Sequence, residues 1–88
     1  MYMDWTILMG FQDLIKQGEW YESKGDYAAS QKYYDEAASW YLKATFEYRK
    51  AYEYADKYDD YARKQEAYAK ERDSECKRSD VRTQGWGL

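Results

Sequence analysis

Few side chains in this sequence could carry catalysis. The 88 residues include no histidine, and Cys76 is the only cysteine. Acid–base chemistry would fall to carboxylates, which need a concave, partly dry pocket to shift their pKa values. The adjacent Asp59 and Asp60 would face different directions on a helix, and Cys76 lies in a densely charged segment without the oriented cationic setting of a nucleophilic thiol. We therefore expect no catalytic residue and predict that the chain is not an enzyme.

Metal, cofactor and nucleic-acid sites are equally unsupported by the residue types. Without histidine, a chain with one thiol cannot assemble the usual nitrogen and sulfur ligands of zinc, so we expect no metal and no cofactor. The basic residues between Arg63 and Arg82 could contact phosphates, but acidic residues alternate with them and the net charge is −3. Because nucleic-acid-binding modules are usually strongly basic, direct nucleic-acid binding is not expected.

Aromatic residues are the chemically informative feature. Twelve Tyr, four Trp and two Phe are too many to hide inside a domain of 88 residues. Tyrosine and tryptophan are enriched in protein interfaces, where they supply a large contact area with few rotatable bonds. The competing interpretation is that these rings are half-buried lids over a thin core. The predicted partner-binding residues are Tyr33, Trp40, Tyr54, Tyr58 and Tyr61.

The core that positions these rings must itself be aromatic. Four Leu, two Ile and one Val cannot fill an interior, whereas ten alanines offer small surfaces on which rings can pack. Trp20, Tyr27, Tyr34, Tyr41 and Tyr48 fall on one heptad position, and alanines follow three of the tyrosines at a spacing of three residues, which predicts a seam between helices. The predicted core comprises Leu8, Phe11, Leu14, Gly18, Tyr21, Tyr27, Tyr34, Ala37, Tyr41 and Tyr48.

Helix is the only regular structure that the composition favours. The sequence contains no proline, and residues 26–84 contain no glycine but many good helix formers. Asp4 suits the N-cap of a first helix, and Gly25 can take the left-handed conformation that ends one. Asp26 suits the cap of the next helix. A further break is expected at Asp60, because the acidic cluster before it opposes the dipole of the preceding helix.

These signals predict an all-α fold. A single helical domain would span residues 1–82, with helices at about 4–24, 27–56 and 60–79, and residues 83–88 would form a flexible tail. The three helices would pack as an antiparallel bundle, and a fourth helix is left open. The apolar stretch Met1–Phe11 is interrupted by Asp4, lacks preceding basic residues and is too short to span a membrane. We therefore expect a cytoplasmic location without membrane contact.

The stretch from Leu14 to Leu42 resembles a tetratricopeptide repeat, in which two antiparallel helices pair over about 34 residues. The residues that match its small, aromatic and turn positions are Gly18, Tyr21, Gly25, Asp26, Tyr27, Tyr34 and Ala37. The resemblance implies a helical hairpin with its turn at residues 25–27. The stretch from Glu22 to Ser30, together with the spacing of Tyr68, Arg72 and Cys76, is also similar to small accessory regulators of the PerC and ANR type.

The function hypothesis is a non-enzymatic protein–protein interaction module, a helical adaptor or regulator that binds an unidentified protein through an aromatic-rich face. The heptad seam is also compatible with homo-oligomerisation of the chain. The alternative is a small phage- or mobile-element-type inhibitor or regulator that docks an acidic, tyrosine-rich face on a basic host protein that handles nucleic acid. Sensitivity of the interaction to salt would favour the alternative.

Overall fold

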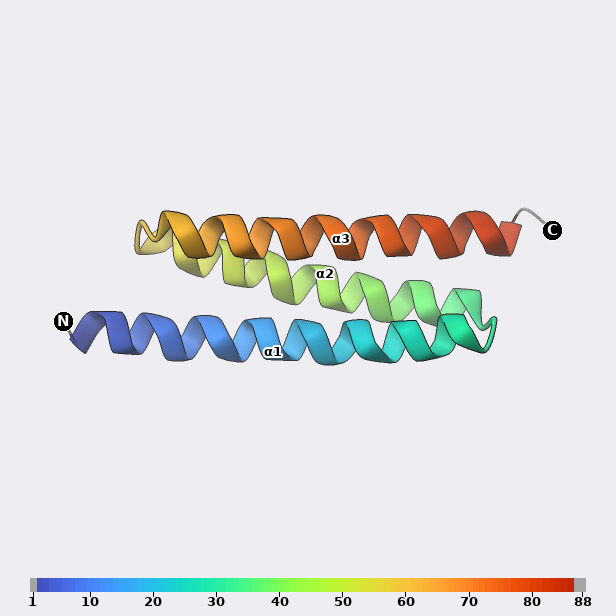
Figure 1. Ribbon diagram of the computed structural model, residues 1–88, viewed down its shortest axis with the longest axis horizontal. Helices are drawn as coiled ribbons and strands as arrows, with labels where there is room; N and C mark the ends of the chain where they lie inside the picture. The colour runs from blue at the N-terminus through green and yellow to red at the C-terminus, as the bar shows by residue number, and fades with distance from the viewer. Residues whose placement is uncertain (1, 87–88) are drawn as a thin grey trace.

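The chain folds into three α-helices that run back and forth beside one another (Figure 1). A computed structural model describes the backbone of residues 2–86 and the side chains of residues 10–85. Its helices are α1 (Tyr2–Ser30), α2 (Tyr34–Lys57) and α3 (Tyr61–Trp86). The predicted all-α class and three-helix bundle are confirmed, and residues 2–86 contain neither a strand nor a fourth helix.

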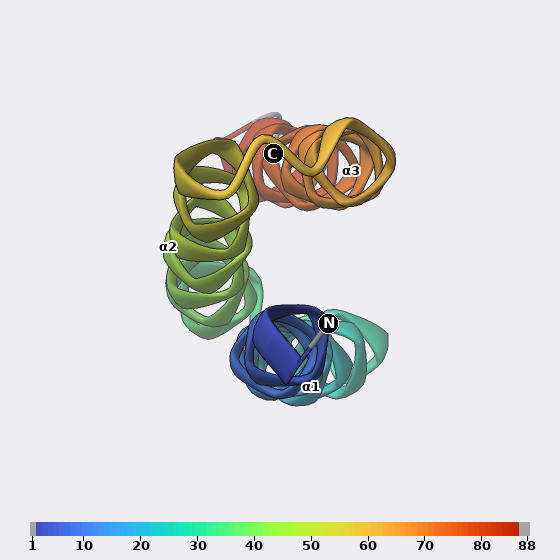
Figure 2. The ribbon, with the colours of Figure 1, turned by 90° about the vertical axis from the view of Figure 1, so that its left-hand side faces the viewer.

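α2 is the central helix. α1 and α3 each pack along α2, whereas they approach one another at few positions. Seen end-on, the three helices form an open arc with α2 in the middle (Figure 2). The molecule is long and thin, with extents of 53 × 17 × 13 Å. This arrangement leaves the contact between α1 and α3 to long side chains.

The apolar core consists mainly of rings packed on alanines. Its first cluster contains Phe11, Ile15, Ala44, Tyr48, Ala51, Ala55 and Ala67, and its second contains Ala28, Ala37, Tyr41 and Val81. Alanine supplies more of these buried positions than Leu, Ile and Val together. The shortage of aliphatic side chains is therefore met by tyrosine and alanine.

Most predicted core residues lie inside the bundle, with one clear exception. Buried members are Phe11, Gly18, Ala37, Tyr41 and Tyr48, and half-buried members are Leu14, Tyr21 and Tyr34. Tyr27 is 67% exposed, so its assignment to the core was wrong. It shares the heptad position of Tyr41 but belongs to α1, where that position is solvent-exposed, as it also is at Trp20 one heptad earlier. Leu8 lies outside the residues whose side chains the structure describes.

Glycines of α1 make room for tyrosine rings of α2. A Cβ atom on Gly18 would lie 2.5 Å from Cε1 of Tyr48. A Cβ atom on Gly25 would lie 2.6 Å from Cε1 of Tyr41. Such contacts are far closer than non-bonded carbon atoms allow, so only glycine fits at these two positions. One heptad separates the two glycines, and one heptad separates the two tyrosines.

The first helix continues through Gly25, which corrects the predicted end near residue 24. No described glycine has a positive φ, and Gly25 provides a flat surface for the Tyr41 ring instead of ending the helix. α1 ends at Ser30, and the first turn lies at residues 31–33. Residues 25–27, where the tetratricopeptide resemblance places its turn, are helical.

Both turns use a Schellman motif without glycine. Lys32 is left-handed, with φ 65°, and the amide of Tyr33 donates to the carbonyl of Ala28 at 2.9 Å. The end of α2 repeats this pattern, with φ 56° at Asp59 and a 2.9 Å bond from the amide of Asp60 to the carbonyl five residues earlier. Because both left-handed residues carry side chains, neither turn has the glycine that usually marks a helix end.

Asp60 caps α3, as the acidic cluster predicted. Its Oδ1 accepts a hydrogen bond from the amide of Arg63 at 3.2 Å, and its Oδ2 pairs with the Arg63 guanidinium at 2.7 Å. These hydrogen bonds lower the pKa of the Asp60 carboxyl. α3 then runs to Trp86, so residues 83–86 are helical and not the predicted flexible tail. Residues 87–88 lie outside the described residues.

Candidate functional site

Polar side chains join all three helices on the open side of the arc. Lys77 of α3 pairs with Glu22 at 2.7 Å and with Asp26 at 3.1 Å, both on α1. The same carboxylates accept hydrogen bonds from hydroxyls of α2, which Tyr48 donates to Glu22 at 2.7 Å and Tyr41 donates to Asp26 at 2.6 Å. We call these five residues the tyrosine–carboxylate network. It fixes the position of α3 relative to α1.

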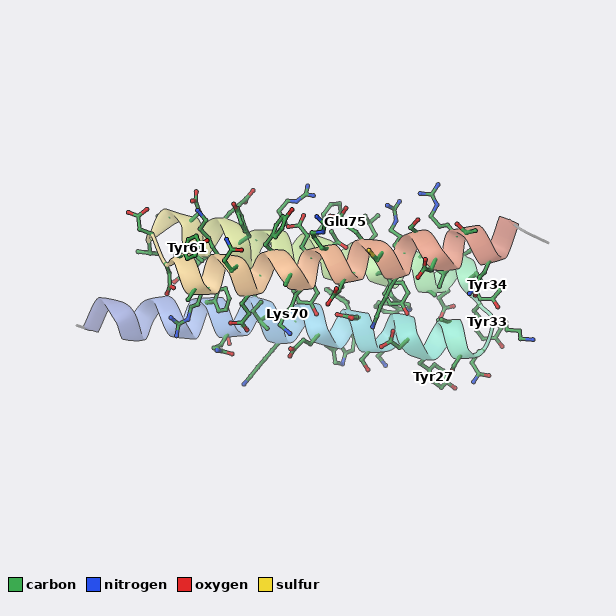
Figure 3. All side chains as sticks on the ribbon, turned by 45° about the horizontal axis from the view of Figure 1, so that its top comes forward. Tyr27, Tyr33, Tyr34, Tyr61, Lys70 and Glu75 are labelled. Carbon is green, nitrogen blue, oxygen red and sulfur yellow. The ribbon has the colours of Figure 1, made fainter. Side chains whose placement is uncertain are left out.

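Two further cations of α3 extend the same row at heptad spacing. Lys70 points from α3 toward α1 (Figure 3) and pairs with Glu19 at 3.0 Å. The guanidinium of Arg63 lies 6.0 Å from the centroid of the Phe11 ring. Exposed ion pairs of this kind contribute about 1 kcal/mol or less each. The open side of the arc is therefore held by long cations, and more weakly than the two faces of α2.

The tyrosine–carboxylate network is structural in character. Each of its hydroxyl, carboxylate and ammonium groups has a partner within the chain. No buried side-chain nitrogen or oxygen among the described residues lacks a hydrogen bond. A catalytic acid or base would need a free position for substrate, and these groups already bind one another. The network positions the three helices relative to one another.

Burial and hydrogen bonding keep the two network phenols protonated. Burial, followed by the hydrogen bond to Asp26, raises the pKa of Tyr41 well above its usual value. Burial and the hydrogen bond to Glu22 do the same for Tyr48. Burial alone would lower the pKa of Lys77, but its hydrogen bonds to the two carboxylates outweigh burial and raise it.

The fold should therefore lose stability at alkaline pH. Unfolded phenols ionise near pH 10, whereas Tyr41 and Tyr48 stay protonated when folded, so their contribution is complete below about pH 10 and lost above it. We expect a fall of about 1.4 kcal/mol per pH unit for each phenol. Urea unfolding between neutral pH and about pH 11 measures this slope. The Tyr41→Phe/Tyr48→Phe variant should show a flatter profile, and an unchanged slope would contradict the prediction.

An aromatic cluster lies on the outer side of the α1–α2 pair. The Trp20 and Trp40 rings meet edge to face, with centroids 5.9 Å apart, and Tyr21 stacks on Trp40 at the same distance. Trp20 is 50% exposed despite these contacts. Phe46 is also 50% exposed, and it lines a shallow hollow that Tyr21 and Lys43 share. Large rings of both α1 and α2 therefore remain in solvent.

Two lysines lie over this cluster. The Lys24 ammonium is 5.1 Å from the Trp20 ring centroid, and that of Lys43 is 4.9 Å from the Trp40 ring centroid. Among the described residues, neither lysine has a carboxylate within ion-pair distance. We define the tryptophan face as Trp20, Tyr21, Lys24, Trp40, Lys43 and Phe46.

The five predicted partner-binding residues do not form one surface. Trp40 belongs to the tryptophan face, where it is half-buried. Tyr33 is 59% exposed at the α1–α2 turn, and Tyr61 is 72% exposed at the opposite end of the molecule (Figure 3). Tyr54 and Tyr58 are half-buried, with ring centroids 5.3 Å apart. Tyr54 packs against Gly10.

Sequence reasoning missed Trp20 and Phe46 as surface residues. Trp20 shares the heptad position of Tyr41 and Tyr48, which suggested a place in the seam, but it lies on α1 and not on α2. Phe46 follows no periodic pattern. The only signal for Trp20 was its distance of two residues from Gly18, which places it on another side of the helix from the tyrosine-contacting glycines.

Comparison with protein-family models, curated proteins and solved structures found no match to this chain.

The described residues were also searched for other kinds of site. Cys76 is exposed and forms no disulfide. Among residues 10–85, whose side chains the structure describes, no three acidic, cysteine or histidine side chains lie close enough together to hold a metal ion. None of the helices within residues 2–86 is both long and apolar enough to cross a membrane. The tryptophan face is the surface on which a functional argument can be built.

Proposed function

We propose that this chain is a non-enzymatic protein–protein interaction module, a helical adaptor or regulator that binds its partner through the tryptophan face. The observation that carries the proposal is the half exposure of Trp20 and Phe46 in a chain that is short of aliphatic residues for its core. Burying those rings in the interior would have stabilised the fold. Their place on the surface is accounted for by a partner that covers them.

The composition and rigidity of the tryptophan face suit a binding surface. Tryptophan and tyrosine are enriched among the few interface residues that contribute most of the binding energy. The rings of this face pack on one another, with centroids 5.5–5.9 Å apart among Trp20, Tyr21 and Trp40. Because these contacts already restrict the side chains, little side-chain entropy remains to be lost on binding. α1 and α2 are regular helices around these rings, and they present them as a fixed surface.

The geometry gives less support to the two other functional hypotheses, homo-oligomerisation and docking on a basic host protein. Homo-oligomerisation through the heptad seam would need Tyr41 and Tyr48 at the surface, but both are buried against α1. Docking on a basic host protein would need an acidic face, whereas the unpaired charges on the tryptophan face are Lys24 and Lys43. Binding through the tryptophan face is the function that the geometry supports best.

Replacing Trp20 by alanine should remove partner binding while leaving the fold intact. We expect at least a tenfold loss of affinity, because Trp20 is half exposed and packs against both Tyr21 and Trp40. The measurement is recovery of partner proteins from cell extract by the wild-type and Trp20→Ala proteins, followed by titration of each recovered protein. Tyr61→Ala, which removes a 72% exposed ring at the far end, is the matched control. Equal recovery by the Trp20→Ala protein would contradict the proposal.

A further inference from the structure

We propose that the tryptophan face binds an acidic amphipathic helix of its partner, with apolar side chains on the rings and carboxylates on Lys24 and Lys43. This inference rests on the proposed function and adds the chemical class of the partner segment. Both the charge and the shape of the tryptophan face support it.

The charge of the face is opposite to that of the chain. The protein carries a net charge of −3, yet the two ammonium groups beside the exposed rings have no carboxylate partner among the described residues. By contrast, Lys70 and Lys77, on the open side of the arc, are both paired with acids of α1. Lys24 and Lys43 come from different helices and lie over different rings, so a segment that covers the rings meets both cations. Carboxylates on that segment would form ion pairs with both ammonium groups.

The shape of the face favours a helix as the occupant. Tyr21, Lys43 and Phe46 line an open hollow of about 490 Å³, large enough for an apolar side chain to enter. Trp20 stands beside this hollow on α1, so the apolar strip crosses from one helix to its neighbour. A strip of rings between two packed helices accepts the apolar side of a third helix, which presents side chains at steps of three and four residues.

Two other occupants fit less well. In a symmetric pair of chains the same patch meets itself, which would bring the unpaired Lys24 and Lys43 of one copy toward those of the other. A membrane surface is a plane, so it would also contact residues around the hollow. Glu47 and Glu53 line that hollow together with Lys43, Arg49 and Lys50, so a plane of anionic lipids would meet charges of both signs there. A helix is narrower than a membrane surface, and its carboxylates can be placed at Lys24 and Lys43 alone.

Two synthetic helical peptides test the proposal directly. Both carry the same leucine and tryptophan stripe, flanked by glutamates in one peptide and by lysines in the other. Fluorescence anisotropy should show that the acidic peptide binds at least tenfold more tightly than the basic one. Its affinity should fall as salt rises from about 0.05 to about 0.5 M. Equal binding of the two peptides, or no binding of the acidic one, would overturn the proposal.

Charge reversal locates the interaction. The Lys24→Glu/Lys43→Glu protein should lose about tenfold in affinity for the acidic peptide. The control is Lys57→Glu/Arg72→Glu, which makes the same change of net charge at two exposed cations that also lie over tyrosine rings, and it should bind as wild type. If both double variants bind equally, the assignment to this face is wrong.

Two further experiments distinguish binding of an acidic helix from membrane binding and from binding of another kind of partner segment. Vesicles containing phosphatidylserine should not bind the protein, and vesicle binding without binding of the acidic peptide would overturn the proposal. A recovered partner that is lost with Trp20→Ala but unaffected by the Lys24→Glu/Lys43→Glu change would leave the proposed function standing and overturn the acidic helix alone. Recovery that is independent of Trp20 would instead count against the proposed function itself.

Discussion

Replacing Tyr48 by alanine should lower the free energy of unfolding by about 3–5 kcal/mol. Tyr48 is 0% exposed, lies in the first apolar cluster, and its ring rests on Gly18. Alanine would leave a cavity where glycine offers no side chain to fill it, and few aliphatic neighbours can move in. A domain of this size has only about 5–15 kcal/mol to lose, so much of the population would unfold. Urea unfolding followed by circular dichroism measures the change.

A graded series separates the ring from its hydroxyl. Tyr48→Phe keeps the ring and removes the hydrogen bond to Glu22, which still has Lys77 at 2.7 Å, so we expect a loss of about 1 kcal/mol. Tyr61→Ala removes an equally large but 72% exposed ring, and should cost about 0.5 kcal/mol or less. Should Tyr48→Ala cost no more than Tyr61→Ala, the core is not built on tyrosine rings.

The helical fold and its aromatic core could be predicted because they follow from composition and short-range spacing. A chain without proline and with few β-branched residues has little choice but helix. Tyr41 and Tyr48 share a heptad position with alanines three residues later, and a period of seven keeps such residues on one side of a helix. Both tyrosines are indeed buried on α2. The same argument failed for Tyr27, because the pattern does not show where one helix ends and another begins.

The boundary of the first helix could not be predicted because two roles of glycine look alike in sequence. Gly25 followed by Asp26 reads as a helix end and a new cap, yet the ring that requires this glycine is that of Tyr41, sixteen residues later. Only the packed structure reveals that contact. Conversely, the true turns place Lys32 and Asp59 in the left-handed conformation, where a glycine would have been the expected signal. Asp60 was predictable because its cap is local, to the amide of Arg63.

The candidate site was predictable only in kind. An excess of aromatic residues indicated that some rings must be exposed, and Trp40 was among those expected at the surface. Which rings join it depends on the rotation of α1 against α2, and the contacts of Gly18 and Gly25 set that rotation. Trp20 is brought to Trp40 by this packing and by no nearby sequence signal. The unpaired state of Lys24 is likewise a property of the assembled helices.

Gly18→Ala should destabilise the fold by about 2 kcal/mol, although alanine is the better helix former. On an isolated helix the change would stabilise by about 1 kcal/mol. Here the new Cβ atom would lie 2.5 Å from Cε1 and 2.7 Å from Cδ1 of Tyr48, a buried ring that other core residues hold in place. Either α1 moves away from α2 or the ring leaves its position, and both outcomes loosen the core. Gly85→Ala is the control, because its Cβ would meet Tyr34 at 3.3 Å near the end of α3, and it should change stability by about 0.5 kcal/mol or less.

A double-mutant cycle tests whether the Tyr48 ring is the reason that Gly18→Ala destabilises the fold. In the Tyr48→Ala background the space above Gly18 is empty, so adding Gly18→Ala should stabilise the protein by about 1 kcal/mol, the opposite of its effect in the wild type. Measuring all four proteins in sulfate buffer, which strengthens apolar burial, keeps the Tyr48→Ala pair folded enough to compare. A loss of stability in both backgrounds would mean that Gly18 is required for some reason other than the Tyr48 ring. A reversal of sign would show that α1 and α2 recognise each other through glycine and tyrosine, which is how a chain with so few aliphatic residues sets the helix rotation that exposes Trp20.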